Sequence, residues 1–291
     1  MKRKLLYLIL FSTSWSVGMQ GLNVPYSYES VSSSQTGIAD LNFNFENPAF
    51  LIQDSEDIIF GFSFGNWIWD TKLNSAFYRN HSSLLRVYSL GNDGLGLYEE
   101  DIPRDNGPLD YFGTQFICLE YSRGIKVPFG IYGGLTLRGN YVDLLLDNIY
   151  GINIDVSAIK PINNRLSVGV NYKNIKILHQ KSDGVRSSLP VNYGFGLYYI
   201  IPVLEIKFLY DYKYLDTRDW GNHLSLSKVF GRFSFIFGYS NYKNIYESFS
   251  YGMKILLTQK WSISYSNINQ IHFDSDSNPN NHSIGLNFLV K

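Results

Sequence analysis

From residue 58 to residue 288 the chain consists of short stretches in which every second residue is apolar, separated by Gly, Asn, Asp and Pro. The clearest stretch, residues 151–158, reads GINIDVSA, with Ile, Val and Ala in one phase and Asn, Asp and Ser in the other. Since successive side chains of a β-strand point to opposite faces, this period of two predicts a sheet with one apolar and one polar face. A closed barrel with lipid outside and a polar lumen satisfies such a pattern along a whole chain.

The alternation divides the chain into about fourteen strands, at roughly nine to eleven residues for each tilted strand of a membrane barrel. The predicted strands are residues 58–64, 69–78, 83–89, 111–121, 129–138, 151–159, 166–172, 191–199, 204–212, 223–228, 232–239, 248–256, 261–268 and 282–290. Two polar stretches, residues 90–110 and 178–190, are predicted as loops. We therefore expect an all-β protein, a transmembrane antiparallel β-barrel, whose even number of strands brings both ends of the barrel sequence to the periplasmic side.

Composition favours a membrane barrel over a soluble β-protein. Charged residues make up 17% of the 291 residues and aromatic residues 16%. Soluble domains are about a quarter charged, so a soluble sandwich or solenoid, the alternative fold, would have a charge-poor surface. The 25 basic and 25 acidic residues cancel, which removes the electrostatic case for nucleic-acid binding.

The N-terminus has the three parts of a secretory signal peptide, which we place at residues 1–18. Basic residues 2–4 precede apolar residues 5–11, and the small residues at 16–18 offer a cleavage site, with Gly21 as the latest alternative. The apolar run is too short to span a bilayer as a helix, and a buried N-terminal helix is the alternative reading.

The remaining chain divides where the alternation begins. We expect residues 19–57 to form a plug segment inside or under the barrel, and residues 58–291 to form the barrel itself. Charged residues of the polar phase are expected to pair with one another or with the plug segment: Arg138, Asp155, Glu205, Lys207 and Asp211. Such a chain would be a monomeric barrel in contact with the lipid of the outer membrane of a Gram-negative-type bacterium.

Aromatic residues gather near the ends of the predicted strands. Rings with a polar edge prefer the boundary between membrane and water, and girdles of such rings mark outer-membrane barrels. Any β-sheet also favours aromatic residues, which is the alternative explanation. The tryptophans predicted to lie in the girdles are Trp67, Trp69, Trp220 and Trp261.

No arrangement of residues predicts catalysis, a cofactor or a metal site. The five histidines have no short metal-binding spacing. Residues 274–278 resemble the start of a calcium loop, but Pro279 and Gly285 stand where such a loop needs Gly and Glu. The single cysteine, Cys118, is expected to be a small apolar filler of a strand. We therefore expect a protein that is not an enzyme.

A compact motif precedes the first predicted strand. Its residues are Asn47, Pro48, Ala49, Phe50 and Leu51. With the strand at 58–64 and the Trp67 that follows, this segment resembles the start of the PorV/PorQ-like outer-membrane barrels, which are related to FadL-type transporters. The order of later features, including Leu189-Pro190 before a strand and a final strand at 282–290, is similar as well. Residues 33–40 depart from the family's usual small-residue run, and Lys291 replaces a terminal aromatic residue.

The resemblance implies a fourteen-stranded barrel with an N-terminal plug and a part in type IX protein secretion or surface attachment. Its partners would be secreted proteins and other components of the secretion system, which the loops at 90–110 and 178–190 would contact. The alternative is a FadL-like channel for hydrophobic small molecules, with an apolar pocket built from Phe43, Phe45, Phe50 and Leu51. A structural or porin-like barrel is the third possibility.

Overall fold

The computed structural model of the chain describes residues 19–42, 45–52, 58–67, 71–97, 110–144, 148–181, 189–216, 219–242, 246–272 and 280–290. The predicted signal peptide at 1–18 lies outside the described residues, as do Phe43, Trp69 and the candidate calcium loop at 274–278. The signal peptide stays a prediction.

Fourteen β-strands follow one another in the order in which the sequence predicts them. Their bounds are β1 Ile58–Asn66, β2 Lys72–Asn80, β3 Ser83–Leu97, β4 Asp110–Val127, β5 Ile131–Asp143, β6 Asn148–Asn163, β7 Leu166–Lys181, β8 Asn192–Ile201, β9 Ile206–Leu215, β10 Asp219–Phe230, β11 Phe233–Tyr242, β12 Tyr246–Leu256, β13 Trp261–His272 and β14 Asn280–Val290.

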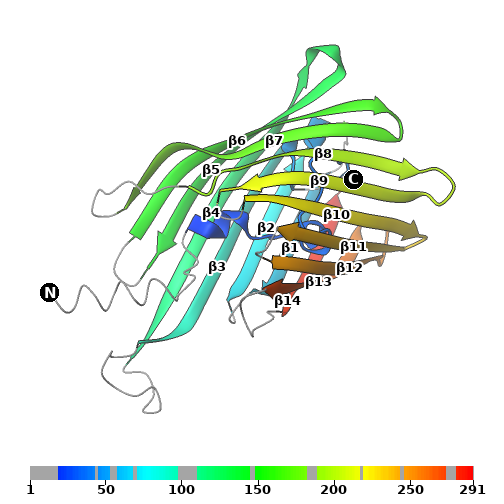
Figure 1. Cartoon of the computed structure of the whole chain (residues 1–291). Coiled ribbons are helices and arrows are strands. Elements are labelled where there is room, and N and C mark those ends of the chain that lie inside the picture. The colour runs from blue at the N-terminus through cyan, green and yellow to red at the C-terminus, as the bar shows by residue number, and fades with distance from the viewer. Residues whose placement is uncertain are drawn as a thin grey trace.

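The strands form one closed antiparallel barrel, in which every strand pairs with its neighbours in sequence (Figure 1). Closure is made by β1 and β14, where Ile58 lies opposite Val290 and Asn66 lies opposite His282. Closure satisfies the backbone hydrogen bonds of both end strands, which is the condition for a sheet to lie in hydrocarbon. The predicted fold class is therefore confirmed.

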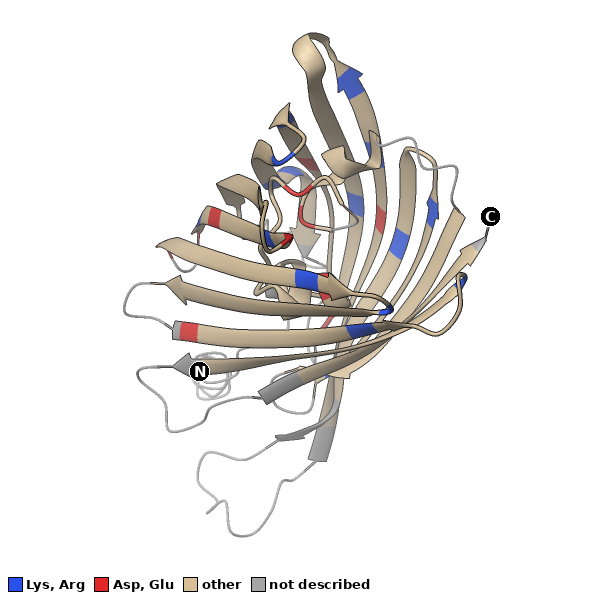
Figure 2. Cartoon of the chain, turned by 90° about the vertical axis from the view of Figure 1, so that its right-hand side faces the viewer, with Lys and Arg blue, Asp and Glu red and all other residues tan. Residues whose placement is uncertain are grey.

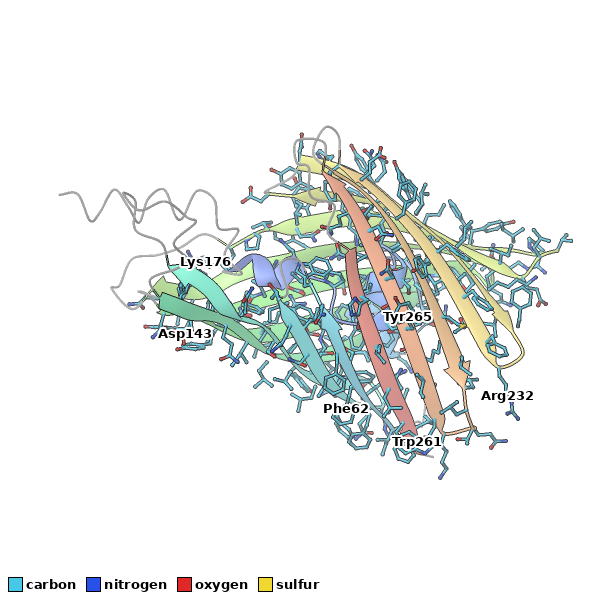
Figure 3. All side chains as sticks on the ribbon, turned by 90° about the horizontal axis from the view of Figure 1, so that it is seen from below. Phe62, Asp143, Lys176, Arg232, Trp261 and Tyr265 are labelled. Carbon is cyan, nitrogen blue, oxygen red and sulfur yellow. The ribbon has the colours of Figure 1, made fainter. Side chains whose placement is uncertain are left out.

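The two faces of the barrel wall follow the alternation in the sequence. Phe62 has 48% of its surface exposed on the outside, whereas the adjacent Ser63 is buried on the inside. Figure 3 shows the side chains of Phe62 and Trp261 projecting away from the ribbon. In β6, Asn153, Asp155 and Ser157 are buried. The polar phase therefore faces the lumen, as predicted, and charged residues are few along the strands (Figure 2).

The barrel has two different ends. At one end, which we call the turn end, strands are joined by the short connections 81–82, 128–130, 164–165, 202–205, 231–232 and 257–260. The connections at the opposite end, which we call the loop end, include the longer stretches 98–109 and 182–191. In outer-membrane barrels short turns face the periplasm and longer loops face outward.

Several strands are longer than the sequence predicts: β7 continues to Lys181 into the predicted loop at 178–190, and β3 is the clearest case. The stretch Gly91-Asn92-Asp93-Gly94 reads as a turn, but β3 continues to Leu97, and a register shift against β4 between Asn92 and Leu95 absorbs the irregularity. The predicted loop at 90–110 is thus too long. Its remaining part, residues 98–109, lies outside the described residues.

Two predicted strands, at 129–138 and 204–212, begin two residues too early. Phe129 lies in the turn Pro128–Gly130 with a left-handed φ of 66°. Glu205 lies in the turn before β9, with a φ of 51°, and its side chain is exposed. Both errors come from counting the alternation through a turn. The prediction that Glu205 faces the lumen is therefore wrong.

The described part of the N-terminal segment lies against the inner face of the barrel. It contains three short helices: η1 Met19–Asn23, α2 Tyr28–Ser32 and η2 Pro48–Ile52. α2 contacts β11 to β14, and η2 contacts β4, β5 and β6. Among the described residues, no helix is long and apolar enough to cross a membrane.

Candidate functional site

The Asn47–Leu51 motif forms a buried turn that is hydrogen-bonded to an earlier part of the N-terminal segment, at Ile38. The Asn47 side chain donates a hydrogen bond from Nδ2 to the Ile38 carbonyl oxygen at 2.6 Å, and its Oδ1 accepts one from the Ala49 N–H at 2.9 Å. Pro48 starts η2, where its fixed φ suits the helix and its missing N–H costs nothing. The motif thus acts within the segment, and its side chains are not presented to solvent.

Two glycines let this turn rest directly on the barrel wall. A Cβ added to Gly134 would lie 2.3 Å from the Ala49 nitrogen, and one added to Gly124 would lie 2.6 Å from the Ile52 nitrogen. Real side chains do not approach a backbone so closely. The bare glycine backbone of β4 and β5 is therefore part of the seat for η2.

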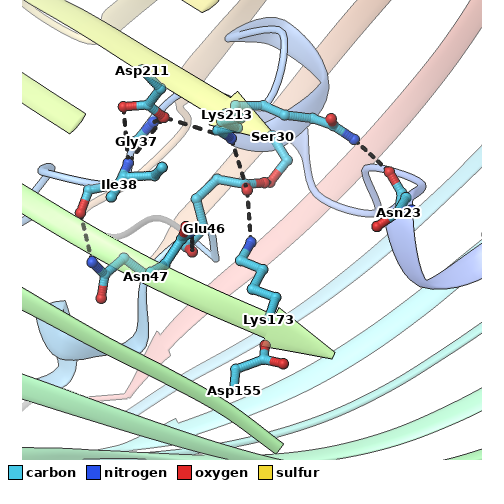
Figure 4. Close-up of polar contacts among 12 residues, drawn as sticks. Asn23, Ser30, Gly37, Ile38, Glu46, Asn47, Asp155, Lys173, Asp211 and Lys213 are labelled. Atoms are coloured by element: carbon cyan, nitrogen blue, oxygen red, sulfur yellow. Dashed lines mark hydrogen bonds and ion pairs between the residues drawn. The ribbon is translucent and has the colours of Figure 1, made fainter. Parts of the chain in front are cut away.

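Next to this turn, the Glu46 carboxylate of the segment contacts two lysines of the wall (Figure 4). Glu46 Oε2 lies 2.8 Å from Lys173 Nζ and 3.4 Å from Lys213 Nζ, and its Oε1 accepts a hydrogen bond from Ser30 Oγ at 3.0 Å. Burial alone would raise the pKa of Glu46. The two ammonium groups outweigh burial and hold that pKa well below its usual range.

A wall carboxylate in turn holds the backbone of the segment. Asp211 Oδ2 accepts hydrogen bonds from the N–H groups of Gly37 at 2.7 Å and Ile38 at 3.1 Å, and lies 3.6 Å from Lys213 Nζ. Lys213 also donates to the Gln35 carbonyl oxygen. The prediction that Asp211 pairs with the segment is confirmed by these contacts. They neutralise the charges of Lys213 and Asp211 inside the barrel.

A second cluster of charges belongs to the wall alone. Glu120 Oε2 lies 2.7 Å from Arg86 Nη2 and 2.8 Å from Arg138 Nε. Arg138 Nη1 lies 2.5 Å from Asp155 Oδ2, as expected from the sequence. These side chains come from four consecutive strands, β3 to β6, so the cluster braces this part of the wall across the lumenal face.

Serine and histidine side chains fix the rest of the segment. His223 Nδ1 lies 2.7 Å from the Ser34 carbonyl oxygen, and His223 Nε2 lies 3.1 Å from the Tyr242 hydroxyl. Ser250 Oγ donates to the Ser32 carbonyl oxygen at 2.8 Å and lies 2.8 Å from Ser34 Oγ. The segment is thus held mainly by hydrogen bonds to the polar lumenal face.

An apolar cluster interrupts the polar lumenal face towards the loop end. Its buried residues are Tyr26, Leu73, Tyr88, Leu90, Phe116, Cys118, Val142, Ile149 and Leu189. Within it, the rings of Tyr26 and Tyr88 lie 3.8 Å apart, and the Tyr26 hydroxyl donates to the Gly21 carbonyl oxygen at 2.6 Å. We call this the inner apolar cluster. It brings segment and wall together by apolar contact.

Sequence reasoning did not identify the inner apolar cluster. A signal is present at residues 116–119, Phe-Ile-Cys-Leu, where both phases of the strand are apolar. Of the residues predicted to form an apolar pocket, Phe45, Phe50 and Leu51 are buried in a separate group with Leu84. They pack against the wall, and Phe43 lies outside the described residues.

A small cavity adjoins the charges and the inner apolar cluster. Its volume is about 40 Å³, and it lies between residues 22–26 of the segment and the side chains of Arg86, Tyr88 and Arg138. A water molecule occupies about 30 Å³ in the liquid. The cavity therefore has room for water but not for a larger apolar solute while the segment lies in this place.

The predicted girdle tryptophans lie in different places. Trp220 stacks on Tyr212 with ring centroids 4.5 Å apart, near the loop end, and Trp261 lies 4.3 Å from Phe288 at the turn end. Trp67 is half-buried and packs against the inner apolar cluster, so it does not belong to an outer girdle. The side-chain phase explains this difference, because odd-numbered residues of β1 face inward. Trp69 lies outside the described residues.

Comparison with known proteins gives a match in structure. No protein-family model matches the chain, and no curated protein matches its sequence. The CymD monoaromatic hydrocarbon channel matches with a TM-score of 0.63 and 13% identity, over 91% of this chain and 97% of that one. The toluene transporter TbuX of Ralstonia pickettii matches with a TM-score of 0.63 and 11% identity, over 91% and 98%. A Pseudomonas aeruginosa FadL homologue matches with a TM-score of 0.55 and 10% identity, over 91% and 97%.

These similarities concern the fold, since the identities are low. They extend along nearly the full length of proteins of the FadL type. They therefore support the similarity to FadL-type transporters that the sequence indicated. They give no support to the PorV/PorQ type in particular. The chain is a closed fourteen-stranded barrel with the fold of outer-membrane hydrocarbon transporters.

Proposed function

We propose that the chain is a non-enzymatic barrel of the outer membrane that admits small apolar molecules, of the size of monoaromatic hydrocarbons. The observation that carries this proposal is the match of the whole barrel to structures named as channels or transporters for such molecules. It replaces protein secretion, the leading prediction from the sequence, as the first candidate.

The inner apolar cluster supports the proposal physically. The free energy of an apolar solute falls by about 25 cal/mol per Å² of apolar surface that it buries when it leaves water for an apolar site. The otherwise polar lumenal face has no reason to carry Phe116, Tyr88 and Val142 unless apolar groups are to meet there. Tyr26 and Leu22 of the segment pack in this cluster, and we propose that a solute takes their place when the segment shifts.

The proposal is tested by uptake. The full chain is expressed in a Gram-negative host that lacks its own hydrocarbon channel, and initial uptake of radiolabelled toluene is measured against cells with an empty vector. We expect uptake several-fold above that background. A folded barrel in the outer membrane that leaves uptake at background would overturn the proposal.

A matched pair of variants locates the site. Val142→Thr places a hydroxyl in the inner apolar cluster with little change in volume, and should lower toluene uptake. Thr136→Val changes the same inward face of β5 away from the cluster, where Thr136 Oγ1 lies 2.8 Å from Ser122 Oγ, and should leave uptake unchanged. Equal effects of both variants would show that the cluster is not the site.

Protein secretion of the PorV/PorQ type is the second candidate. The observation in its favour is that the N-terminal segment is buried against the inner face of the barrel, which suits a barrel that binds partners at its outer surfaces. Purification from the outer membrane in mild detergent, followed by mass spectrometry, separates the two. Co-purification of secreted proteins that share a C-terminal domain, together with background toluene uptake, would favour secretion.

A further inference from the structure

Exposed apolar side chains stand on the turns at the turn end of the barrel. Phe129 is 87% exposed on the β4–β5 turn, and Val203 is 91% exposed on the β8–β9 turn. Ile162 and Phe230 lie at the ends of β6 and β10 next to two other turns, Leu257 lies on the β12–β13 turn, and all three are about half exposed. We call these side chains the apolar tips. A water-exposed surface rarely carries so many exposed apolar side chains unless they contact a partner or a membrane.

Basic residues accompany these tips. Arg123, Lys160, Arg165, Lys228, Arg232 and Lys260 all lie in the turns or within five residues of them, with side chains that are partly or fully exposed. Among the described residues in this zone, Glu205 is the one acidic residue. The loop end differs, since exposed Asp143, Asp216 and Asp219 accompany its lysines. In Figure 3, Arg232 lies at one end of the barrel and Asp143 at the other.

Two lysines are held next to apolar tips. Lys228 Nζ lies 4.7 Å from the centre of the Phe230 ring, and Lys160 donates a hydrogen bond to the Phe129 carbonyl oxygen. A lysine that lies along an apolar surface keeps its ammonium group at the polar edge of that surface. Each pair thus presents an apolar tip with a positive charge beside it, the arrangement that fits the boundary between acyl chains and phosphates.

We propose that Arg123, Lys160, Arg165, Lys228, Arg232 and Lys260 form a basic collar that binds the phosphate groups of anionic phospholipids around the turn end. The collar is continuous with the apolar outer wall, which already faces lipid. Its members lie at four of the six turns, on both sides of the β8–β9 turn, so a surrounding leaflet contacts all of them, whereas a docked protein would cover one side. The proposal does not depend on which solute the barrel admits.

The test measures lipid preference directly. The full chain, purified in mild detergent, is mixed with micelles that contain equal amounts of phosphatidylglycerol and phosphatidylcholine, and retained lipids are counted by native mass spectrometry. We expect phosphatidylglycerol to be retained preferentially. Since each lysine near an anionic surface contributes about 1 kcal/mol, the double variant Lys228→Gln/Lys260→Gln should reduce this preference about thirtyfold.

The control removes the same charge from the other end. Lys72→Gln/Lys176→Gln changes two exposed lysines of the loop end and should leave the lipid preference unchanged. Equal retention of both lipids by the parent protein would overturn the collar, as would equal losses in the two variants. Unchanged lipid preference combined with loss of an acidic protein partner in the collar variant would assign these residues to that partner instead. Heat-modifiable electrophoretic mobility establishes that each variant is folded.

Discussion

At the scale of single residues, Glu46 joins the N-terminal segment to the barrel by charge. Its carboxylate contacts Lys173 and Lys213, which lie on β7 and β9 of the opposing wall. Burying two ammonium groups is costly unless a carboxylate accompanies them. Glu46 therefore ties the segment to the wall, because without it Lys173 loses its carboxylate partner and Lys213 keeps only Asp211.

Glu46→Gln should destabilise the folded barrel by roughly 3 kcal/mol at pH 7, since breaking a buried ion pair leaves a charge uncompensated. Urea unfolding in detergent micelles, followed by tryptophan fluorescence, measures this. Glu205→Gln, at an exposed turn, is the control and should change stability by less than about 0.5 kcal/mol. Equal midpoints for all three proteins would contradict the assigned role.

The same pair of proteins has a defined pH dependence. The pKa of Glu46 is lowered in the folded state, so its contribution is complete above its unfolded pKa of about 4.3 and declines as the pH falls below that value. The stability difference between the parent and Glu46→Gln should therefore shrink between about pH 5 and pH 3. A constant difference across this range would show that folding does not lower the pKa of Glu46.

At the scale of elements, the seat of η2 depends on missing side chains. Gly124 and Gly134 allow the backbone of the segment to lie directly against β4 and β5. A single methyl group at Gly134 would meet the Ala49 nitrogen, and backbone cannot give way as the end of a flexible side chain can. The close approach of the segment is thus built into the strands that receive it.

Gly134→Ala should displace η2 and lower the free energy of unfolding by about 1–3 kcal/mol, as overpacking does. Gly139→Ala is a matched control on the same strand, because a Cβ there meets no atom within 4 Å. Limited proteolysis would report displacement of the segment, and urea midpoints would report the free energy. Equal behaviour of the two variants would contradict the direct contact.

The elements themselves were largely readable from the sequence, because alternation is a local property. All fourteen strands occur where the apolar phase predicts them. Their ends were less predictable. Gly91-Asn92-Asp93-Gly94 has the composition of a turn, yet β3 passes through it, since pairing with β4 outweighs local preference.

The site was less predictable than the fold. The pairing of Arg138 with Asp155 follows from adjacent strands and a shared polar phase, so the sequence predicted it. The contact of Glu46 with Lys213 joins residues that are 167 positions apart, and no local pattern records it. The inward position of Trp67 could have been predicted by extending the phase of β1 by one residue pair.

At the scale of the whole molecule, a rigid wall surrounds a segment that is attached through polar contacts. The wall is a continuous ladder of backbone hydrogen bonds. The segment is held by side chains such as Asp211, His223 and Ser250, whose hydrogen bonds water can replace. The segment is therefore the part expected to move during passage of a solute, while the wall stays closed.

A disulfide between segment and wall tests this division. Ser34 Oγ and Ser250 Oγ lie 2.8 Å apart, so Ser34→Cys/Ser250→Cys brings two sulfurs near the bond length of about 2 Å. The buried Cys118 is removed by Cys118→Ala, to exclude exchange. We expect toluene uptake to fall at least about tenfold in the oxidised protein, because the disulfide prevents the segment from leaving the wall by local unfolding. Reduction by dithiothreitol should restore uptake. Each single cysteine variant should respond to neither treatment. Equal uptake in the oxidised and reduced states would mean that solutes pass while Ser34 stays against β12, and that the path runs elsewhere along the wall.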